Sequence, residues 1–270
     1  MEKGQLLGKG STAEVYGWGQ DKIIKLFFNK YSSDYRVNYE ANVSRIVYES
    51  GVISPAVYDT VEVDGRKGII YERIKGKPII EHLITAPWNS YYYLQKTIEL
   101  QHNIHKFSAK ELPTQEERFT HAIGLSSWIL GDRAKKIIDY MKGLPDGESI
   151  CHGDFYMNNI LVSGKKLVPI DWAGAYQGNP LGDVARTGMI ISSPALPYEI
   201  PDPVTMLSNY PKKLFFWHYI NEYMRRSKAR FADIDSWVLP VAAAKLKDNV
   251  PGEEKWLLDI INKRFEQLNL

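Results

Sequence analysis

Three things are scarce in this sequence, and each scarcity argues against a class of protein. Only one of the 270 residues is cysteine, Cys151, so an internal disulfide cannot form and an oxidised, secreted scaffold is not expected. No run of about 18 apolar residues occurs, and the N-terminal residues lack the apolar core of a signal peptide. The formal net charge of +2 gives no reason to expect nucleic acid or a membrane surface as partner. We therefore expect a cytoplasmic monomer or dimer.

The composition is that of a globular protein, with 44% hydrophobic and 24% charged residues. A chain of this length can bury one large core or two smaller ones. Strand-like alternation dominates before Gly76 and helical spacing dominates after it, with the breaker-rich Lys75–Gly76–Lys77–Pro78 between them. This change predicts an α+β protein with an N-terminal lobe over 1–75 and a C-terminal lobe over 76–270.

The N-terminal segment contains a glycine-rich run, GKGSTA at residues 8–13, that fits the pattern G-x-G-x-x-G/A. In a dinucleotide-binding fold this pattern would open a helix, but residues 13–16 alternate as in a strand and 22–28 form a second apolar run. The segment therefore predicts a glycine-rich hairpin, whose amides could cover phosphates. Taken alone, it is equally a turn without a ligand. No G-x-x-x-x-G-K-[ST] run occurs, which excludes a Walker-type loop.

Lys25 lies within the second apolar run, KIIKLFF. If its side chain points inward it needs anionic partners, because an unpaired buried ammonium is costly, whereas alternation also allows it to face solvent. Residues 33–50 have the apolar spacing of a helix. Glu40 on that helix is the natural candidate to pair with Lys25, and Glu49 is the nearest competitor.

The remaining elements follow from turn signals and periodicity. Asp64–Gly65 predicts a hairpin between strands at 57–63 and 66–74. Pro194–Pro211 is rich in proline and predicts an extended loop. His102 and His105 are three residues apart on an expected helix, but without an evident third ligand they are interpreted as structural. Helices are expected over 91–107, within 114–143, from 181, and over 214–230 and 253–268.

The most informative stretch, 150–172, reads ICHGDFYMNNILVSGKKLVPIDW. It places Asp154, Asn159 and Asp171 on short loops at the ends of two apolar runs, where strands hold polar groups rigidly. Phosphoryl transfer needs a carboxylate that handles a proton, together with oxygen ligands for a hard cation. These three residues therefore form a candidate phosphoryl-transfer site. The alternative, that Asp154 is only an acid in a turn and Asn159 only a capping amide, explains only part of the pattern.

The run HGDFYMNNIL followed by IDW resembles the aminoglycoside phosphotransferase and choline kinase-like family of small-molecule kinases, which uses H-G-D-x-x-x-x-N and then I-D-[WFY]. The other expected elements come in the family's order over most of the chain. The resemblance implies a two-lobed, protein-kinase-like fold, with a mainly antiparallel sheet in the N-terminal lobe and a mostly helical C-terminal lobe.

The resemblance also implies ATP and Mg2+ as cofactors, and it assigns a role to each matching residue. Asp154 would be the catalytic base, and Asn159 and Asp171 would hold magnesium. Asp183 would be a structural anchor that braces the catalytic loop. Gly8, Gly10 and Ser11 would cover the phosphates of the nucleotide. Lys25, positioned by Glu40, would contact the α- and β-phosphates. The backbone from Glu72 to Ile74 would bind the adenine.

Departures from protein kinases favour a small-molecule acceptor. Gly153 stands where protein kinases have arginine, and Asp171 is followed by Trp172–Ala173 rather than Phe-Gly. The acceptor itself stays open between an aminoglycoside, a choline-like amino alcohol, a sugar and a vitamin alcohol. From Gly174 to Leu270 there are eleven acids and twelve bases, so the acidic enrichment that a polycation would need is missing. The alternative function is a nucleotide-binding pseudokinase or adaptor without turnover.

Overall fold

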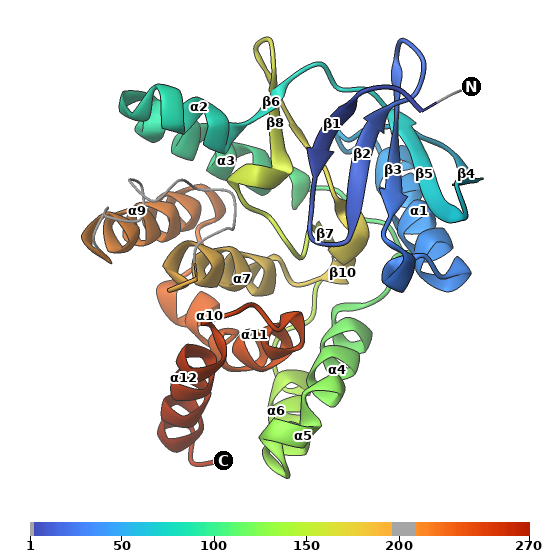
Figure 1. Cartoon of the computed structure of the whole chain (residues 1–270). Helices are drawn as coiled ribbons and strands as arrows, with labels where there is room; N and C mark the ends of the chain where they lie inside the picture. Colours follow the sequence, from blue (N-terminus) through green and yellow to red (C-terminus); the bar gives the residue numbers. More distant parts are fainter. Residues whose placement is uncertain (1–2, 196–208) are drawn as a thin grey trace. The chain divides into compact units, whose positions relative to one another are not determined.

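The computed structural model describes residues 3–195 and 209–270 (Figure 1). The chain divides into two compact units, the first made of Met1–Glu81 and Met157–Ala175, the second of His82–Tyr156 and Tyr176–Leu270. A functional boundary at residue 75 stays a prediction. Within the described residues, every helix is too short or too polar to cross a bilayer.

The first unit is built on a five-stranded sheet whose neighbouring strands are all antiparallel. Its strand order is β1-β2-β3-β5-β4. The bounds are β1 Leu6–Lys9, β2 Ala13–Gly17, β3 Lys22–Phe27, β4 Val57–Val63 and β5 Arg66–Glu72. The predicted hairpin between β4 and β5 is present, and both Asp64 and Gly65 have the positive φ that a two-residue hairpin turn requires. The glycine-rich run extends from the end of β1 to the start of β2, and these strands pair antiparallel, so the predicted hairpin there is also present.

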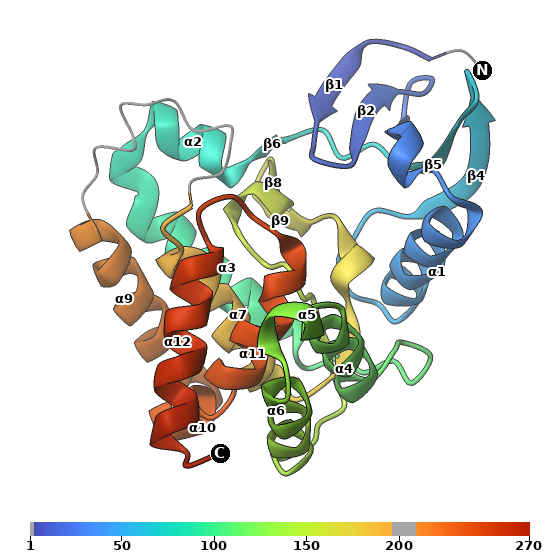
Figure 2. The same ribbon diagram turned by 60° about the horizontal axis from the view of Figure 1, so that its bottom comes forward.

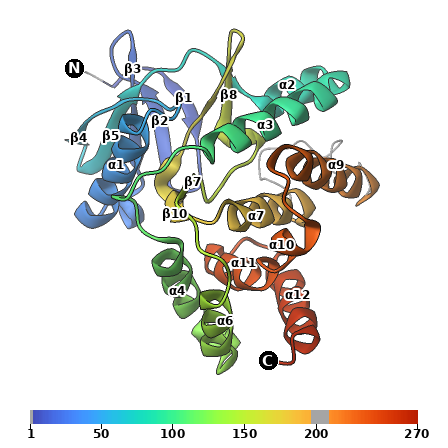
Figure 3. The same ribbon diagram turned by 180° about the vertical axis from the view of Figure 1, so that it is seen from behind.

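Helix α1, Asp34–Glu49, packs on one face of this sheet (Figure 3). Its first turn is capped by Ser33, whose hydroxyl accepts a hydrogen bond from the backbone N–H of Arg36. The helix buries Val37 and Ala41 against residues of β2, β3 and β5. The other face of the sheet has its own apolar cluster, made of Trp18, Ile24, Leu26 and Ile70.

A smaller three-stranded sheet completes the first unit, in the order β6-β8-β9. Its strands are β6 Lys77–Pro78, β8 Ile160–Ser163 and β9 Lys166–Pro169, with short 3-10 turns at Met157–Asn159 and Trp172–Gly174. Gly76 precedes the edge strand, and a Cβ there would lie only 2.3 Å from the carbonyl oxygen of Val162. The close approach of β6 to β8 therefore requires a glycine at this position.

The second unit is mostly helical. Its helices are α3 Ser90–Ile104, α4 Gln115–Leu125, α5 Ser127–Leu130, α6 Arg133–Lys142, α7 Pro180–Ser192, α9 Asn209–Ser227, α10 Phe231–Asp235, α11 Val238–Lys245 and α12 Glu254–Gln267. Helix α2, Ile79–Thr85, contains the point at which the chain passes from the first unit to the second. Further 3-10 turns are formed by Asn29–Tyr31, Pro87–Asn89 and Leu246–Asp248. A two-stranded sheet pairs β7, Ser149–Cys151, with β10, Tyr176–Gly178.

Helix α11 is the centre of this second unit. It packs against α4, α6, α7 and α12, and Figures 1 and 2 show it between α12 and the α4–α6 pair. Every residue from Leu239 to Lys245 is buried. A helix buried on all sides has no polar face, so amphipathic periodicity cannot detect it. The sequence accordingly predicts helices on either side of α11 but not α11 itself.

The predicted loop from Pro194 to Pro211 needs correction at its C-terminal end. Residues 196–208 lie outside the described residues, but α9 already begins at Asn209 rather than at 214. Pro211 falls in the first turn of α9, where an α-helix leaves backbone N–H groups unpaired and proline is tolerated. The same helix ends at Ser227, where Lys228 adopts a positive φ.

Candidate active site

Lys25 points toward α1 because of the alternation of β3. Phe27, two residues further along the strand, belongs to the cluster beneath α1, whereas Ile24 and Leu26 belong to the cluster on the opposite face. Lys25 therefore shares the face of Phe27, and its ammonium lies 2.7 Å from Oε1 of Glu40. The predicted pairing with Glu40 is confirmed. Its competitor Glu49 is exposed at the end of the same helix.

A second carboxylate completes the charge network around Lys25. Oδ1 of Asp171 lies 3.0 Å from the Lys25 ammonium, and the Asp171 side chain is 44% exposed, against 5% for Glu40. Burial alone would lower the pKa of Lys25, but the charges of Asp171 and Glu40 outweigh it and raise that pKa above its ordinary value. The lysine is thus fixed in its charged form, next to one buried and one accessible acid.

Asn159 and Asp171 are brought together by the β8–β9 hairpin. Ile160 pairs with Pro169, and the N–H of Ile170 donates to the carbonyl of Asn159 at 2.9 Å. Asp171 follows directly, in the left-handed conformation with φ 63° and ψ 63°. This conformation is unusual for a residue other than glycine, although Asp and Asn tolerate it best. Such strain is characteristic of functional sites, because the surrounding structure must maintain it.

The donor set of this hairpin end suits magnesium. Asn159 offers an amide oxygen and is 8% exposed, and Asp171 offers a carboxylate. Mg2+ prefers hard oxygen ligands, keeps several waters, and is held in phosphoryl-transfer enzymes by one or two protein groups together with substrate phosphates. One amide oxygen and one carboxylate oxygen on a single hairpin therefore fit the predicted ion.

The glycine-rich hairpin leaves space around its two predicted glycines. A Cβ built on Gly8 meets no atom within 4 Å, and one on Gly10 meets only the carbonyl oxygen of Ala13 at 3.7 Å. Neither residue has a positive φ, and Ser11 is exposed between the strands. Packing within the chain thus gives no reason for glycine at positions 8 and 10. Gly8, Gly10 and Ser11 are all predicted to contact the phosphates of a bound nucleotide.

The predicted adenine segment starts where β5 ends. Glu72 is the last residue of β5, and its backbone N–H donates to Ala56 while its carboxylate accepts from the N–H of the same residue. Ile74 lies in the connecting segment before β6 and is half-buried. This segment is therefore anchored at one end, and its contact with adenine stays a prediction.

In the second unit, Asp183 organises the loop that carries Asp154. Asp183 is fully buried near the start of α7, a helix capped by Asn179. Its Oδ1 accepts a 2.8 Å hydrogen bond from the N–H of Gly153, and its Oδ2 accepts one of 3.3 Å from the N–H of His152. The predicted bracing of the catalytic loop is thus present as two direct hydrogen bonds.

Two side chains from α3 and its C-terminal end complete the surroundings of Asp183. Nε2 of Gln101 and Nε2 of His105 lie 3.0 and 3.1 Å from Oδ2 of Asp183. Despite burial, which by itself raises a carboxyl pKa, the hydrogen bond and charge of His105 and the Gln101 amide lower the pKa of Asp183 to about 2. His105 is therefore a structural residue, as predicted. Gln101 was missed, because nothing in the sequence distinguishes a buried helical glutamine from an exposed one.

Arg186 is a further residue that sequence analysis missed. Its Nε donates to the carbonyl of Gly153. Its Nη2 donates to Oδ2 of Asp248 at 2.7 Å and lies 3.9 Å from Oδ1 of Asp154. These contacts place a fixed positive charge beside the predicted base. Arg186 follows Asp183 by three residues, so helical spacing alone places both on one face of α7 and could have identified it.

Comparisons with known proteins place these features in context. The sequence family described as "Phosphotransferase enzyme family" matches residues 4–202. No curated protein sequence matches the chain. Among solved structures, an aminoglycoside-3'-phosphotransferase of type VIII is similar, with 14% identity, TM-score 0.58, and coverage of 90% of this chain and 93% of the other.

Two other solved structures are similar in the same way. A choline kinase from Cryptosporidium parvum Iowa II has 14% identity and a TM-score of 0.58, over 99% of this chain and 90% of its own. An aminoglycoside phosphotransferase from Streptomyces rimosus, in complex with ADP and streptomycin, has 13% identity and a TM-score of 0.55, over 86% of this chain and 90% of its own. At these identities the likeness shows a shared fold, and the predicted α+β, kinase-like fold is confirmed.

Proposed function

The chain belongs to the phosphotransferase enzyme family, and on that premise we propose that it transfers the γ-phosphate of ATP to a hydroxyl group of a small molecule. The prediction of a small-molecule kinase is confirmed by the family. The proposal extends it to the reaction and to the residues that perform it. The observation that carries this extension is the Lys25–Glu40–Asp171 network in the first unit.

The residues of the first unit would bind and orient the nucleotide. Lys25, kept charged by its two carboxylate neighbours, would contact the α- and β-phosphates, and Glu40 would hold its side chain in place. Asn159 and Asp171 would hold Mg2+, which neutralises charge on the β- and γ-phosphates when bound. The open space at Gly8 and Gly10 supports a close approach of their backbone amides, with that of Ser11, to phosphate oxygens.

Asp154 in the second unit would accept the proton of the acceptor hydroxyl. As that oxygen bonds to the γ-phosphorus, the bond from phosphorus to the β–γ bridging oxygen breaks and ADP leaves. Asp183 keeps the backbone before Asp154 in a fixed conformation, which supports the orientation that such a proton transfer needs. The backbone from Glu72 to Ile74 would receive the adenine.

Magnesium-dependent release of ADP tests this proposal. The acceptor panel contains aminoglycosides, choline, sugars and vitamin alcohols, each assayed with ATP and with GTP. We expect stimulated release with at least one acceptor, and its loss when EDTA removes the metal. If nucleotide binds and no acceptor stimulates release, the chain is a nucleotide-binding pseudokinase instead.

A substitution at Asp154 tests the assigned base. Asp154→Asn should lower kcat by about 10²- to 10⁴-fold, the usual contribution of a positioned general base. Its Kd for ATP should change little, because the predicted nucleotide contacts lie in other residues. Asp139→Asn, an exposed aspartate on α6, is the matched control and should have the kcat of the unmodified chain. Substantial turnover in Asp154→Asn would remove Asp154 from this role.

A further inference from the structure

Gly153, the residue before the predicted base, is held at both of its backbone polar groups by one turn of α7. Its N–H donates to Oδ1 of Asp183 at 2.8 Å, and its carbonyl accepts a hydrogen bond from Nε of Arg186. Gly153 has a positive φ of 77°, a conformation that glycine adopts easily but does not keep by itself. Two hydrogen bonds from one helix therefore fix the direction in which the chain enters Asp154.

Arg186 also reaches the side chain of that base. Its Nη2 lies 3.9 Å from Oδ1 of Asp154, and the Asp154 side chain is 43% exposed, against 12% for Arg186. The planar guanidinium has donors at fixed angles, so one side chain can hold a backbone carbonyl and face the carboxylate of the next residue at the same time. The orientation of Asp154 is therefore coupled to that of Arg186, while its carboxylate remains accessible to an acceptor.

The guanidinium is itself held by Asp248. Nη2 of Arg186 donates to Oδ2 of Asp248 at 2.7 Å, and the Asp248 side chain is 24% exposed. A partly buried ion pair of this kind keeps both charges in one arrangement, and a charge that is already paired attracts a further anion only weakly. Arg186 is therefore suited to hold its neighbours in place rather than to bind an anionic ligand.

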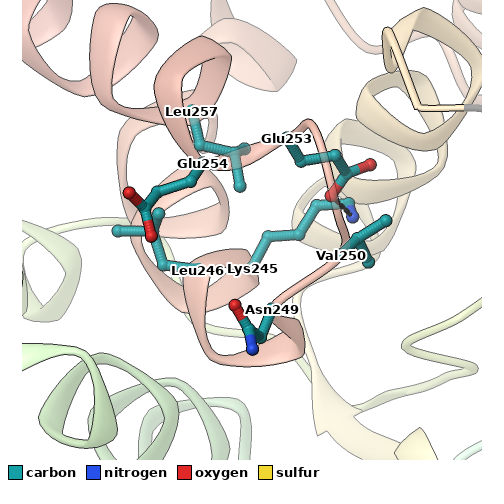
Figure 4. A pocket seen from close by; sticks show the side chains of 7 residues that line it. All are labelled: Lys245, Leu246, Asn249, Val250, Glu253, Glu254 and Leu257. Carbon is teal, nitrogen blue, oxygen red and sulfur yellow. Dashed lines mark hydrogen bonds and ion pairs between the residues drawn. The ribbon is translucent and has the colours of Figure 1, made fainter.

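The segment that carries Asp248 connects α11 to α12 and is closely packed. Lys245, at the end of α11, forms a buried ion pair with Glu253, and Figure 4 shows the two side chains directed toward each other. The cavity that this pair lines has a volume of only about 10 Å³, about the space of one water. Glu253 also accepts a hydrogen bond from the hydroxyl of Ser193, directly after α7. The connection is thus tied both to α7 and to the residue that follows it, which fixes the place of Asp248.

We propose that Arg186 is a positioning residue for phosphoryl transfer, which orients Asp154 through the carbonyl of Gly153 and through its own charge. Asp248 acts on the base only by holding Arg186. Proton transfer needs the carboxylate within hydrogen-bond reach of the acceptor hydroxyl, and a misplacement of about 1 Å can cost about 10²-fold in rate. The inference rests on the proposed kinase function and adds two residues to it.

Kinetics of ADP release test the role of Arg186, with water as the acceptor and with each compound of the acceptor panel. In Arg186→Gln, kcat should fall by about 10²-fold, while KM for ATP stays within about twofold because the predicted nucleotide contacts lie in other residues. Arg186→Lys keeps the charge but has one ammonium in place of the fork, so kcat should fall by only about tenfold. Arg225→Gln also removes an arginine–carboxylate pair, at an exposed position of α9, and should leave kcat unchanged.

Two double variants test the order in which these residues act. If Arg186 acts through Asp154, then Arg186→Gln should lower kcat by less than about twofold further in the Asp154→Asn background. Asp248→Asn alone should lower kcat by about tenfold, and it should add no further loss to Arg186→Gln. Urea unfolding shows which variants are folded, and if Arg186→Gln is not, Arg186→Lys replaces it in both comparisons.

The positioning role and the kinase function fail in different ways. An unchanged kcat in Arg186→Gln, an equal loss in Arg225→Gln, or losses that multiply in either double variant would overturn the positioning role and leave the kinase intact. A higher KM for ATP with an unchanged kcat would also overturn it, because Arg186 would then serve nucleotide binding. The absence of ADP release from the unmodified chain with every acceptor would overturn the kinase function and this inference together.

Discussion

Two buried carboxylates, Glu40 in the first unit and Asp183 in the second, serve their surroundings in different ways. Glu40 is 3% exposed and its partner is the ammonium of Lys25. Asp183 is fully buried and its partners are two backbone N–H groups, an amide and an imidazole. Burying a carboxylate is costly in both places, and a charged partner offsets that cost in one while several hydrogen bonds offset it in the other.

A buried carboxylate therefore has a different role in each unit. Glu40 positions a cation whose other neighbour, Asp171, is open to a ligand, so the network can exchange partners when phosphates arrive. Asp183 is fully buried and has no such opening. Its two backbone donors, the N–H groups of His152 and Gly153, fix the conformation of the backbone before Asp154. Substitutions in the first network should therefore change activity more than stability, and those around Asp183 should change stability strongly.

The largest expected effect is on catalysis, in Asp171→Asn. Asparagine keeps the size of the side chain and tolerates the left-handed backbone of this position. It removes the negative oxygen needed for the predicted metal, and a bound metal contributes several kcal/mol to such reactions. We expect kcat for ADP release to fall by at least about 10³-fold, which is about 4 kcal/mol.

Urea unfolding provides the structural readout for the same variant. The midpoint should stay close to that of the unmodified chain, because Lys25 keeps Glu40 as a partner. Asp59→Asn, an exposed residue of β4 in the same unit, is the matched control for both measurements. A large loss of stability with little loss of kcat would make Asp171 a structural residue like Asp183.

The next largest effect is on stability, in Asp183→Asn. The amide NH₂ would face the donors of Gln101 and His105, so buried donors would be left without an acceptor. Breaking a buried network of this kind costs about 3 kcal/mol, measured as the free energy of unfolding in urea. Asp139→Asn on α6 is the control and should be neutral. A shift below about 0.5 kcal/mol would contradict the bracing role.

The same variant has a distinctive pH dependence. The pKa of Asp183 is lowered to about 2, from about 3.9 in an unfolded chain. A depressed carboxyl pKa contributes stability that is present above about pH 4 and is lost as the pH falls toward 2, a contribution of about 3 kcal/mol. The stability gap between the unmodified chain and Asp183→Asn should therefore narrow over that window. A constant gap would mean that the charge of Asp183 is unimportant.

The sequence predicted the parts of these networks that depend on local order. Alternation in β3 and helical spacing in α1 were enough to propose Glu40 for Lys25, and turn residues were enough to place the β4–β5 hairpin. Asp154, Asn159 and Asp171 were found because their motif is short and continuous, and their catalytic roles stay predictions. The bracing by Asp183 was predicted from the family resemblance.

What the sequence could not supply are contacts between distant segments. Gln101 reaches Asp183 across 82 residues, and Asp248 reaches Arg186 across 62. Pairings of this kind depend on how helices pack, and no residue type or spacing marks them in advance.

A smaller effect is expected in Glu40→Gln. The variant keeps the shape of the side chain and loses the charge that positions Lys25, as when a partner of a metal or phosphate ligand is removed. We expect kcat/KM for ATP to fall by about 10- to 100-fold, with a modest loss in the free energy of unfolding. Glu49→Gln, an exposed residue at the end of the same helix, is the matched control. Equal kinetics in both variants would separate Glu40 from the nucleotide site.

The smallest effect is expected from a substitution at Tyr71, whose hydroxyl contacts Glu40. The hydroxyl of Tyr71 lies 3.3 Å from Oγ of Ser44 and 3.4 Å from Oε1 of Glu40, so both hydrogen bonds are long. Burial raises the pKa of Tyr71, and the phenol therefore stays neutral and adds no charge to the pair. Tyr71→Phe keeps the ring packed against α1 and should reduce the free energy of unfolding by about 1 kcal/mol.

Its kinetic consequence should be slight, because Lys25 holds Glu40 directly at 2.7 Å without help from the phenol. KM for ATP in Tyr71→Phe should remain within about twofold of that of Tyr58→Phe, a control on the exposed tyrosine of β4, since one weak neutral hydrogen bond changes an equilibrium little. A rise in KM comparable to that in Glu40→Gln would mean that the phenol, and not the ion pair alone, positions Lys25. The division between a charge network in the first unit and a hydrogen-bond network in the second would then no longer hold.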